Sequence, residues 1–187
     1  MVHLSGPRHL RYLSVFNACV LLVAILWLAI GQTEARSDSA SSHAEAYDWN
    51  LPHWTPEPIV PSDNLMTAAK VELGRHLFYD KRLSADESMS CATCHRQEKA
   101  FTDGKSRSKG IDGTLGGRSA MSLANVGYLP VLTWMNPNLN SLEVQALIPI
   151  FGEHPVEMGM AGREHLLFER LKAEPRYRTL FAEAFPK

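Results

Sequence analysis

The chain is poor in three features, and each absence removes a class of function. It has three cysteines in 187 residues, too few for the disulfide framework of a small secreted scaffold. Its 19 basic and 20 acidic residues give a formal net charge of −1, so no uniform field exists to hold nucleic acid or an anionic membrane surface. Alternating strand patterns of useful length are also lacking. What remains is a globular chain, 45% apolar, of one ordinary domain plus extensions.

The first 35 residues have the pattern of an export signal. Arg8 and Arg11 precede an apolar run from Ala18 to Ile30, which ends in small and polar residues. Cleavage after Ala35 fits the small-residue rule and predicts a periplasmic protein with no membrane span in its mature form. An uncleaved anchor is the alternative, because Leu13 to Ile30 is 18 residues long and about 20 cross a bilayer.

An arm is expected at residues 36–62, which are rich in Ser, Ala and Pro, because its prolines block a regular helix. Isolated exposed Trp is uncommon, so the apolar side chains of the arm indicate that it lies on a surface: Trp49, Trp54 and Ile59.

The remainder, residues 63–187, is expected to be an all-α domain with long irregular connections. Apolar side chains at helical spacing predict helices at Thr67–Tyr79 and Ser141–Leu147, each capped by its first residue, then one around Leu166–Leu171 and one opened by Pro175. Five glycines between Gly104 and Gly117 predict a loop, and Pro149 with Pro155 predicts a bent segment.

The chemistry is carried by Cys91-Ala92-Thr93-Cys94-His95, the attachment pattern of c-type haem. Two intervening residues let both sulfurs face one porphyrin edge, and the next residue, His95, projects toward the metal. A zinc knuckle would need two further ligands, and no second cysteine pair exists. A thioredoxin-type motif expects a βαβ context, whereas a disulfide between Cys91 and Cys94 stays open. We expect covalent haem c in a cytochrome c-like domain.

The sixth coordination position of the iron separates two functions. An open position admits peroxide and makes an enzyme, whereas a second strong ligand makes a one-haem electron-transfer cytochrome, the alternative function. The candidates for that ligand also have ordinary explanations as core fillers or as packed or solvent-facing side chains: Met121, Met135, His154, Met158 and Met160. A third possibility is an exported remnant that does not fold.

Three stretches, in order, resemble the bacterial di-haem cytochrome c peroxidase and MauG family. They are LGRHLFYDKRLSADESMSCATCHRQEKAFTDG from Leu73, GRSAMSLANVGY from Gly117 and LEVQALIPIFGEHPVEMGM from Leu142, and the resemblance covers most of Val60 to Leu171. The third stretch and the residues before it are most similar to the MauG-like branch that includes the methanobactin-associated enzyme MbnH.

The resemblance implies a role for each of several residues. Cys91, Cys94 and His95 would carry the peroxide-reacting haem, with His95 as the proximal ligand. Glu157 would be the acid on the distal side, Gln145 would line the same pocket, and Trp134 would relay electrons between two haems. The implied partners are hydrogen peroxide and either an electron-donor protein or a protein substrate bearing an oxidisable aromatic residue.

This chain departs from the family pattern in three places. The Gly-rich loop lacks the His that closes the resting haem in other peroxidases of the family, so we expect an open site. A calcium-ligating Asn of relatives falls on Ser119, which makes calcium doubtful. No second C-x-x-C-H occurs before Lys187, so we expect the N-terminal haem domain alone, as a truncated form or a one-haem descendant, whereas full-length relatives carry a second haem.

Overall fold

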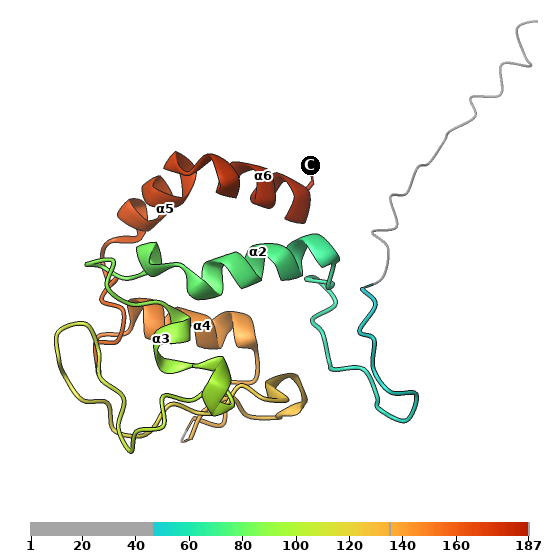
Figure 1. Cartoon of the computed structure of the whole chain (residues 1–187), viewed down its shortest axis with the longest axis horizontal. Coiled ribbons are helices and arrows are strands. Elements are labelled where there is room, and N and C mark those ends of the chain that lie inside the picture. The colour runs from blue at the N-terminus through green and yellow to red at the C-terminus, as the bar shows by residue number, and fades with distance from the viewer. Residues whose placement is uncertain (1–46, 135, 187) are drawn as a thin grey trace, which may run out of the picture. The chain divides into compact units, whose positions relative to one another are not determined.

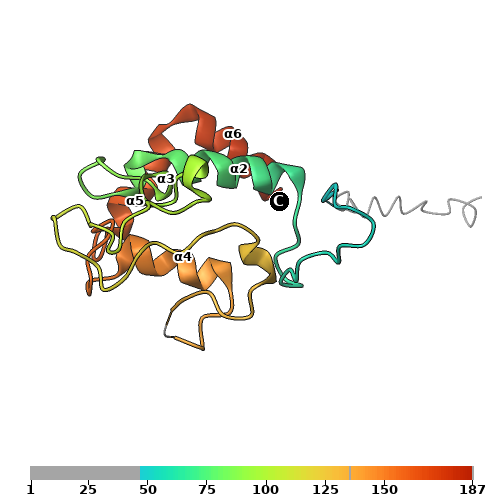
Figure 2. The same ribbon diagram turned by 60° about the horizontal axis from the view of Figure 1, so that its bottom comes forward.

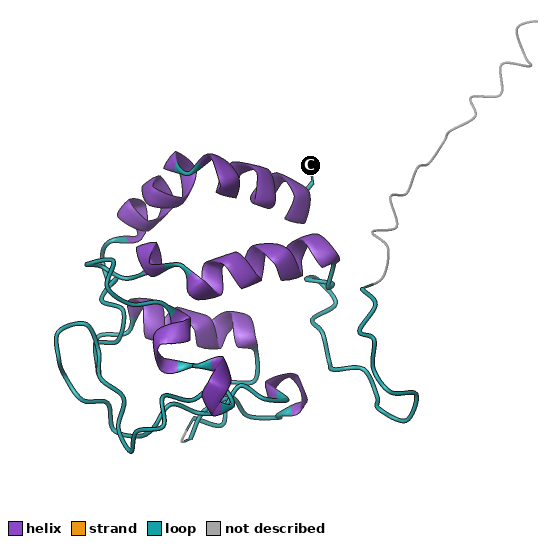
Figure 3. Ribbon diagram, viewed as in Figure 1, coloured by secondary structure: helices purple, strands orange, loops and turns teal. Residues whose placement is uncertain are grey.

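The computed structural model describes residues 47–134 and 136–186 (Figure 1). The export signal predicted over residues 1–35 and the first residues of the arm lie outside these ranges. The elements in chain order are α2 (Ala68–Tyr79), η1 (Lys81–Leu83), α3 (Cys91–Cys94), η2 (Gln97–Lys99), η3 (Val126–Tyr128), α4 (Leu142–Phe151), α5 (Glu164–Ala173) and α6 (Pro175–Ala184), where η marks a 3-10 helix. Figure 3 shows helices joined by long loops, and the described residues contain no strand, which confirms the all-α prediction.

Helix α2 forms where the sequence predicts it and lies at the centre of the helical packing. The hydroxyl of Thr67 accepts a hydrogen bond from the Lys70 N–H at 3.2 Å, so the predicted cap is confirmed. α2 packs against α6 along one side and against α3 along another (Figures 1 and 2). The haem motif on α3 is thereby attached directly to the helix that packs on α6.

The closing helices α5 and α6 also form as predicted, with Pro175 in the first turn of α6. Together with α2 and a segment before α5 they enclose the hydrophobic core. Its buried members are Leu73, Leu83, Met158, Met160, Leu167, Leu171, Tyr177, Leu180 and Ala184. No helix in the described ranges is both long and apolar enough to cross a membrane.

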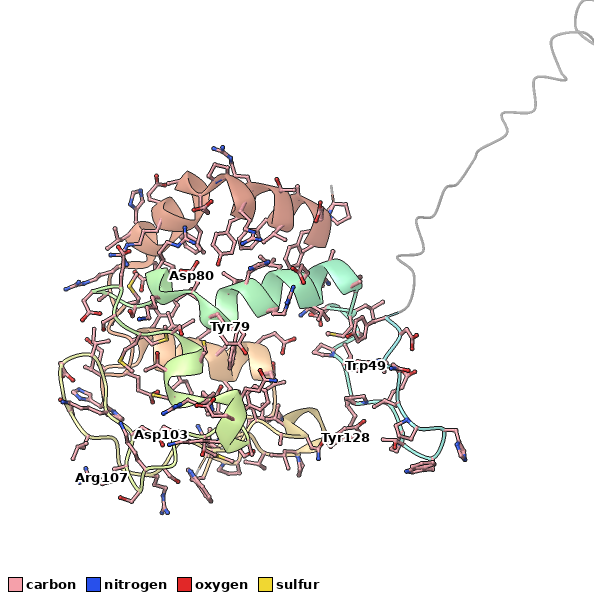
Figure 4. All side chains as sticks on the ribbon, viewed as in Figure 1. Trp49, Tyr79, Asp80, Asp103, Arg107 and Tyr128 are labelled. Carbon is pink, nitrogen blue, oxygen red and sulfur yellow. The ribbon has the colours of Figure 1, made fainter. Side chains whose placement is uncertain are left out.

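A polar clamp fastens the end of α2 to α6. The Tyr177 hydroxyl donates to Oδ2 of Asp80 at 2.5 Å, and Arg82 Nε donates to the other oxygen of Asp80 at 2.9 Å. Arg82 also reaches Glu174 at 2.7 Å. Burial raises the pKa of the Asp80 carboxyl, but the hydrogen bonds from Arg82 and Tyr177 outweigh it and lower the pKa overall. Figure 4 shows Asp80 where α2 ends, on the side of the two closing helices.

Helix α4 is longer than predicted, because it continues through Pro149 to Phe151 instead of ending at Leu147. The backbone carbonyls of its last turn are bound from outside the helix. Met158 N–H donates to the Pro149 carbonyl at 2.9 Å, and Met160 N–H donates to the Ile150 carbonyl at 3.0 Å. These hydrogen bonds from outside the helix offset the helix break that a proline is expected to cause.

The start of α4 also differs from the prediction. Ser141 occupies the capping position, but its hydroxyl donates to the Glu143 carboxylate at 2.6 Å instead of accepting from the helix backbone. The helix therefore begins at the predicted place without the predicted cap.

The described part of the arm is anchored through proline backbone and not through the side chains we expected. The Tyr128 hydroxyl donates to the Pro56 carbonyl at 2.9 Å, and Figure 4 shows Tyr128 beside the arm. Trp54 and Ile59 are 74% and 95% exposed. The expectation that these two side chains lie on a surface is wrong, because a backbone carbonyl supplies the contact between the arm and η3. Trp49, the third side chain of that expectation, is half-buried and its ring contacts Tyr47.

We predict that Tyr177→Phe lowers the free energy of unfolding of the haem-loaded protein by about 2 kcal/mol, because it removes a part-buried hydrogen bond to a charged group. Urea denaturation followed by circular dichroism measures the change. Tyr128→Phe is the matched control, since it removes an exposed hydroxyl contact, and it should change the value by less than about 0.5 kcal/mol. Equal effects would show that the clamp contributes no particular stability.

Candidate functional site

The two motif cysteines lie on a single helical turn, α3, and both are free thiols. The turn begins with a hydrogen bond from the Ser90 N–H to Oγ1 of Thr93 at 3.0 Å, and it closes with His95 N–H bound to the Cys91 carbonyl at 2.9 Å. Burial raises the pKa of both thiols, and the negative charges of nearby carboxylates raise that of Cys94 further. The two sulfurs are not joined to each other in the structure, so it does not show the disulfide alternative.

The imidazole of His95 is oriented by a backbone carbonyl. Its Nδ1 lies 2.9 Å from the carbonyl oxygen of Phe101. A carbonyl only accepts hydrogen bonds, so Nδ1 carries a proton, and in the neutral ring Nε2 is then the nitrogen with the lone pair. This is the arrangement that a metal-binding histidine needs, with one nitrogen held by the protein and the other available to the metal.

A tight turn brings the Phe101 carbonyl back to His95. Ala100 and Phe101 have φ angles of 52° and 59°, in the left-handed region that residues other than glycine seldom adopt. The turn is closed by Phe101 N–H to the Arg96 carbonyl at 2.8 Å and by Arg96 N–H to the Thr102 carbonyl at 3.1 Å. Strained backbone of this kind is concentrated at functional sites. Here it serves to place one acceptor beside the imidazole.

Glu157 interacts electrostatically with the haem motif. Its carboxyl is half-buried, and burial raises its pKa, with a smaller opposing effect from the positive charge that His95 carries when its ring is protonated. Glu157 in turn raises the pKa of Cys94, as does the buried carboxyl of Asp103. Both carboxyls therefore lie within electrostatic range of the motif turn.

The other two candidates from the sequence are placed differently. Gln145 is half-buried on α4, the helix whose end binds the backbone N–H groups of Met158 and Met160, just after Glu157. Trp134 is 56% exposed, and its indole N–H donates to the Ser119 carbonyl at 3.2 Å. In the described part of the chain, no hydrogen bond or ring contact links Trp134 to His95 or Glu157.

Helix α4 has an apolar surface that the described residues leave uncovered. Its aliphatic side chains are between 42% and 53% exposed at Leu142, Val144, Leu147 and Ile148, and none of its residues is fully buried. Single exposed apolar residues are common, but four on one short helix indicate a surface that another group covers. The residues fit a c-type haem, because free thiols, a correctly protonated imidazole and an uncovered apolar helix are all present.

Most of the residues predicted as candidate sixth ligands of the iron are buried in the core or border a different cavity. Met158 and Met160 are 3% and 0% exposed and belong to the hydrophobic core, as core fillers do. His154 is exposed and borders an open cavity of about 490 Å³, whose lining residues do not include the motif. Met121 is half-buried, and Met135 lies outside the described residues. For the zinc alternative, the described ranges hold no group of three or more His, Cys, Asp or Glu that would bind a metal.

Comparison with known proteins decides the family. Residues 68–187, more than half of the chain, match the family described as di-haem cytochrome c peroxidase. The chain belongs to this family. Di-haem cytochrome c peroxidases carry c-type haem.

Relatives in this family cover the same part of the chain. Cytochrome-c peroxidase IdrP1 of Denitromonas iodatirespirans is 37% identical over 149 residues, covering 78% of this chain and 38% of the relative. Methylamine utilization protein MauG of Methylorubrum extorquens is 38% identical over 125 residues, covering 67% of this chain and 34% of the relative. A crystal structure of a MauG-like protein associated with microbial copper homeostasis superposes with a TM-score of 0.73 at 48% identity, covering 75% of this chain and 41% of that one. The chain thus spans less than half the length of these relatives.

Sequence reasoning missed two contributors to the site. The Phe101 carbonyl could not be found, because every residue offers a carbonyl and its direction depends on the turn. Asp103 was missed because an aspartate in a polar loop gives no sign of burial, yet it acts on Cys94.

We predict that Cys91→Ser with Cys94→Ser abolishes covalent haem, because no thiol remains to form a thioether. Haem staining of a denaturing gel after expression with the haem-attachment machinery measures it. Ala92→Ser, on the same turn, is the matched control and should stain like the wild type. A haem band retained by the double variant would rule out attachment through this motif.

Proposed function

We propose that residues 68–187 form the peroxide-reacting haem domain of a periplasmic peroxidase of the di-haem cytochrome c peroxidase and MauG type. One covalent haem would be held by Cys91, Cys94 and His95, and Glu157 would move the proton. The observation that supports this most is the geometry of the motif, in which two free thiols on one turn precede an imidazole held through Nδ1 by the Phe101 carbonyl. The half-buried carboxyl of Glu157, which raises the pKa of Cys94, lies within electrostatic range of this turn.

When bound, the haem supplies an iron centre able to take peroxide and the electrons needed to cleave its O–O bond. The protein residues do the rest. Glu157 accepts the proton from one peroxide oxygen and returns it to the other, which then leaves as water. Burial suits the carboxyl to both steps, since a raised pKa lets it hold the proton for longer than an exposed glutamate would.

The other candidate residues would support this chemistry by holding the metal, lining the pocket and passing electrons. His95 would hold the metal through Nε2 while the Phe101 carbonyl fixes the ring. Gln145 would line the pocket with its amide, from a helix bonded to the segment of Glu157. Trp134, anchored on Ser119 and largely exposed, would pass electrons to the site from an electron-donor protein or from an oxidisable aromatic residue of a protein substrate.

The electron-transfer alternative is less favoured by the packing. Met158 and Met160 fill the hydrophobic core, and His154 is exposed beside a different cavity. The ferric protein should therefore give a high-spin optical and EPR spectrum. A fully low-spin spectrum with histidine and methionine ligation would show a closed iron and favour the electron carrier.

We predict that Glu157→Gln keeps haem content unchanged and slows the reaction with hydrogen peroxide by about 10²- to 10⁴-fold, the range for lost acid–base catalysis. Stopped-flow absorbance of the haem measures the rate. The exposed Glu153, four residues away, supplies the matched control, and Glu153→Gln should react like the wild type.

The pH dependence provides a second test of the same residue. Glu157 must be ionised to accept a proton, and its pKa is raised above the usual 4.5, so the rate should climb with pH through an inflection above that value. Glu157→Gln should lack this limb. If the variant has the rate and pH profile of the wild type, Glu157 takes no part in the reaction.

A further inference from the structure

The Gly-rich loop touches the backbone that carries Glu157. A Cβ atom built on Gly110 would lie 1.8 Å from the carbonyl oxygen of Val156 and 2.9 Å from its carbonyl carbon. Both partner atoms belong to the backbone, so no side-chain movement could relieve the overlap. Glycine at position 110 is therefore required for this close approach.

The next residue in the loop adds two contacts to the same segment. Ile111 N–H donates to the carbonyl oxygen of Glu157 itself at 3.0 Å. The side chain of Ile111 covers Gly159, where a Cβ would lie 2.4 Å from Cδ1 of Ile111. Gly159 also has a φ of +69°, which favours glycine in its own right.

The loop is itself closed, so it forms a firm support. Gly116 N–H donates to the Ser108 carbonyl at 2.8 Å, and Gly110 N–H donates to the Thr114 carbonyl at 2.9 Å. These bonds draw the two arms of the loop together at its base and again near its tip. Figure 1 shows the loop, in yellow-green, as a long excursion whose two arms run side by side.

The residue after Glu157 is held by other elements. Met158 donates through its N–H to the Pro149 carbonyl of α4, and its own carbonyl accepts from Ala85 N–H at 2.8 Å. Glu157 is bound only on its carbonyl side, by Ile111, among the backbone hydrogen bonds of the described residues. The peptide group that follows Glu157 is thus held from two sides, at its carbonyl by Ile111 of the loop and at its N–H by Pro149 of α4.

We propose that Gly110 and Ile111 are positioning residues, which set the backbone of Glu157 so that its carboxyl faces the space beside His95. The inference rests on the proposed role of Glu157 in proton transfer. A displacement of about 1 Å in a catalytic group can cost on the order of 10²-fold in rate, so a backbone contact that sets the position of an acid has a measurable effect.

The main test compares two glycines of one loop in the haem-loaded protein. Gly110→Ala must displace the Val156 carbonyl, whereas a Cβ at Gly117 would meet no atom within 4 Å. We expect Gly110→Ala to retain its haem and its ferric spectrum and to react with hydrogen peroxide at least tenfold more slowly. Gly117→Ala should react like the wild type. Equal rates for the two variants would overturn the proposal.

A double variant separates positioning of Glu157 from a general loss of structure. If Gly110 acts through Glu157, adding Gly110→Ala to Glu157→Gln should slow the reaction no further. The acid inflection of the rate should also shift to lower pH in Gly110→Ala, because burial is what raises the pKa of Glu157 most and a displaced carboxyl regains water. Additive slowing with an unmoved inflection would contradict the proposal.

The outcomes also distinguish this proposal from the proposed function. A slow Glu157→Gln with a fast Gly110→Ala would reject the positioning role alone, whereas a fast Glu157→Gln would reject both. Should Gly110→Ala fail to fold, Ile111→Ala replaces it, since this change keeps the N–H donor and removes the contact with Gly159. We expect a three- to tenfold slower reaction for Ile111→Ala, and a rate equal to that of Gly117→Ala would reject the proposal.

Discussion

The segment from Val156 to Met160 joins the hydrophobic core to the candidate acid. Met158 and Met160 are buried in the core formed with α2, α5 and α6, whereas Glu157 is only half-buried. The packing of the two methionines therefore also holds the backbone that carries the candidate acid.

The segment from Val156 to Met160 also connects α4 to the chain that leads into the haem motif. It binds the last carbonyls of α4 on one side and Ala85, a few residues before the motif, on another. The motif turn in turn packs on α2. The position of Glu157 relative to His95 is thus set by backbone hydrogen bonds and core packing, with no direct contact required between the two side chains.

Local patterns in the sequence were sufficient to predict the elements that are stabilised by interactions between near neighbours in the chain. α2 with its Thr67 cap, α6 with its opening proline, and the single turn of the cysteine motif all follow from residue types at fixed spacing. The continuation of α4 past Pro149 could not be predicted, because it depends on backbone amides nine and ten residues further along the chain. The same is true of the arm, where a tyrosine hydroxyl from η3 selects a proline carbonyl and leaves Trp54 exposed. Glu157 was assigned from the family resemblance; its residue type and neighbours alone favour a surface glutamate.

The partner of the His95 ring has a consequence for the metal that the ring would hold. A peptide carbonyl is a neutral and weakly basic acceptor, so it leaves the Nδ1 proton on the imidazole. A carboxylate at the same place would draw that proton away and give the ring imidazolate character, making it a stronger electron donor. With the Phe101 carbonyl instead, ferric iron would be stabilised less, and its reduction potential would lie higher than that of an otherwise equal site with a carboxylate partner.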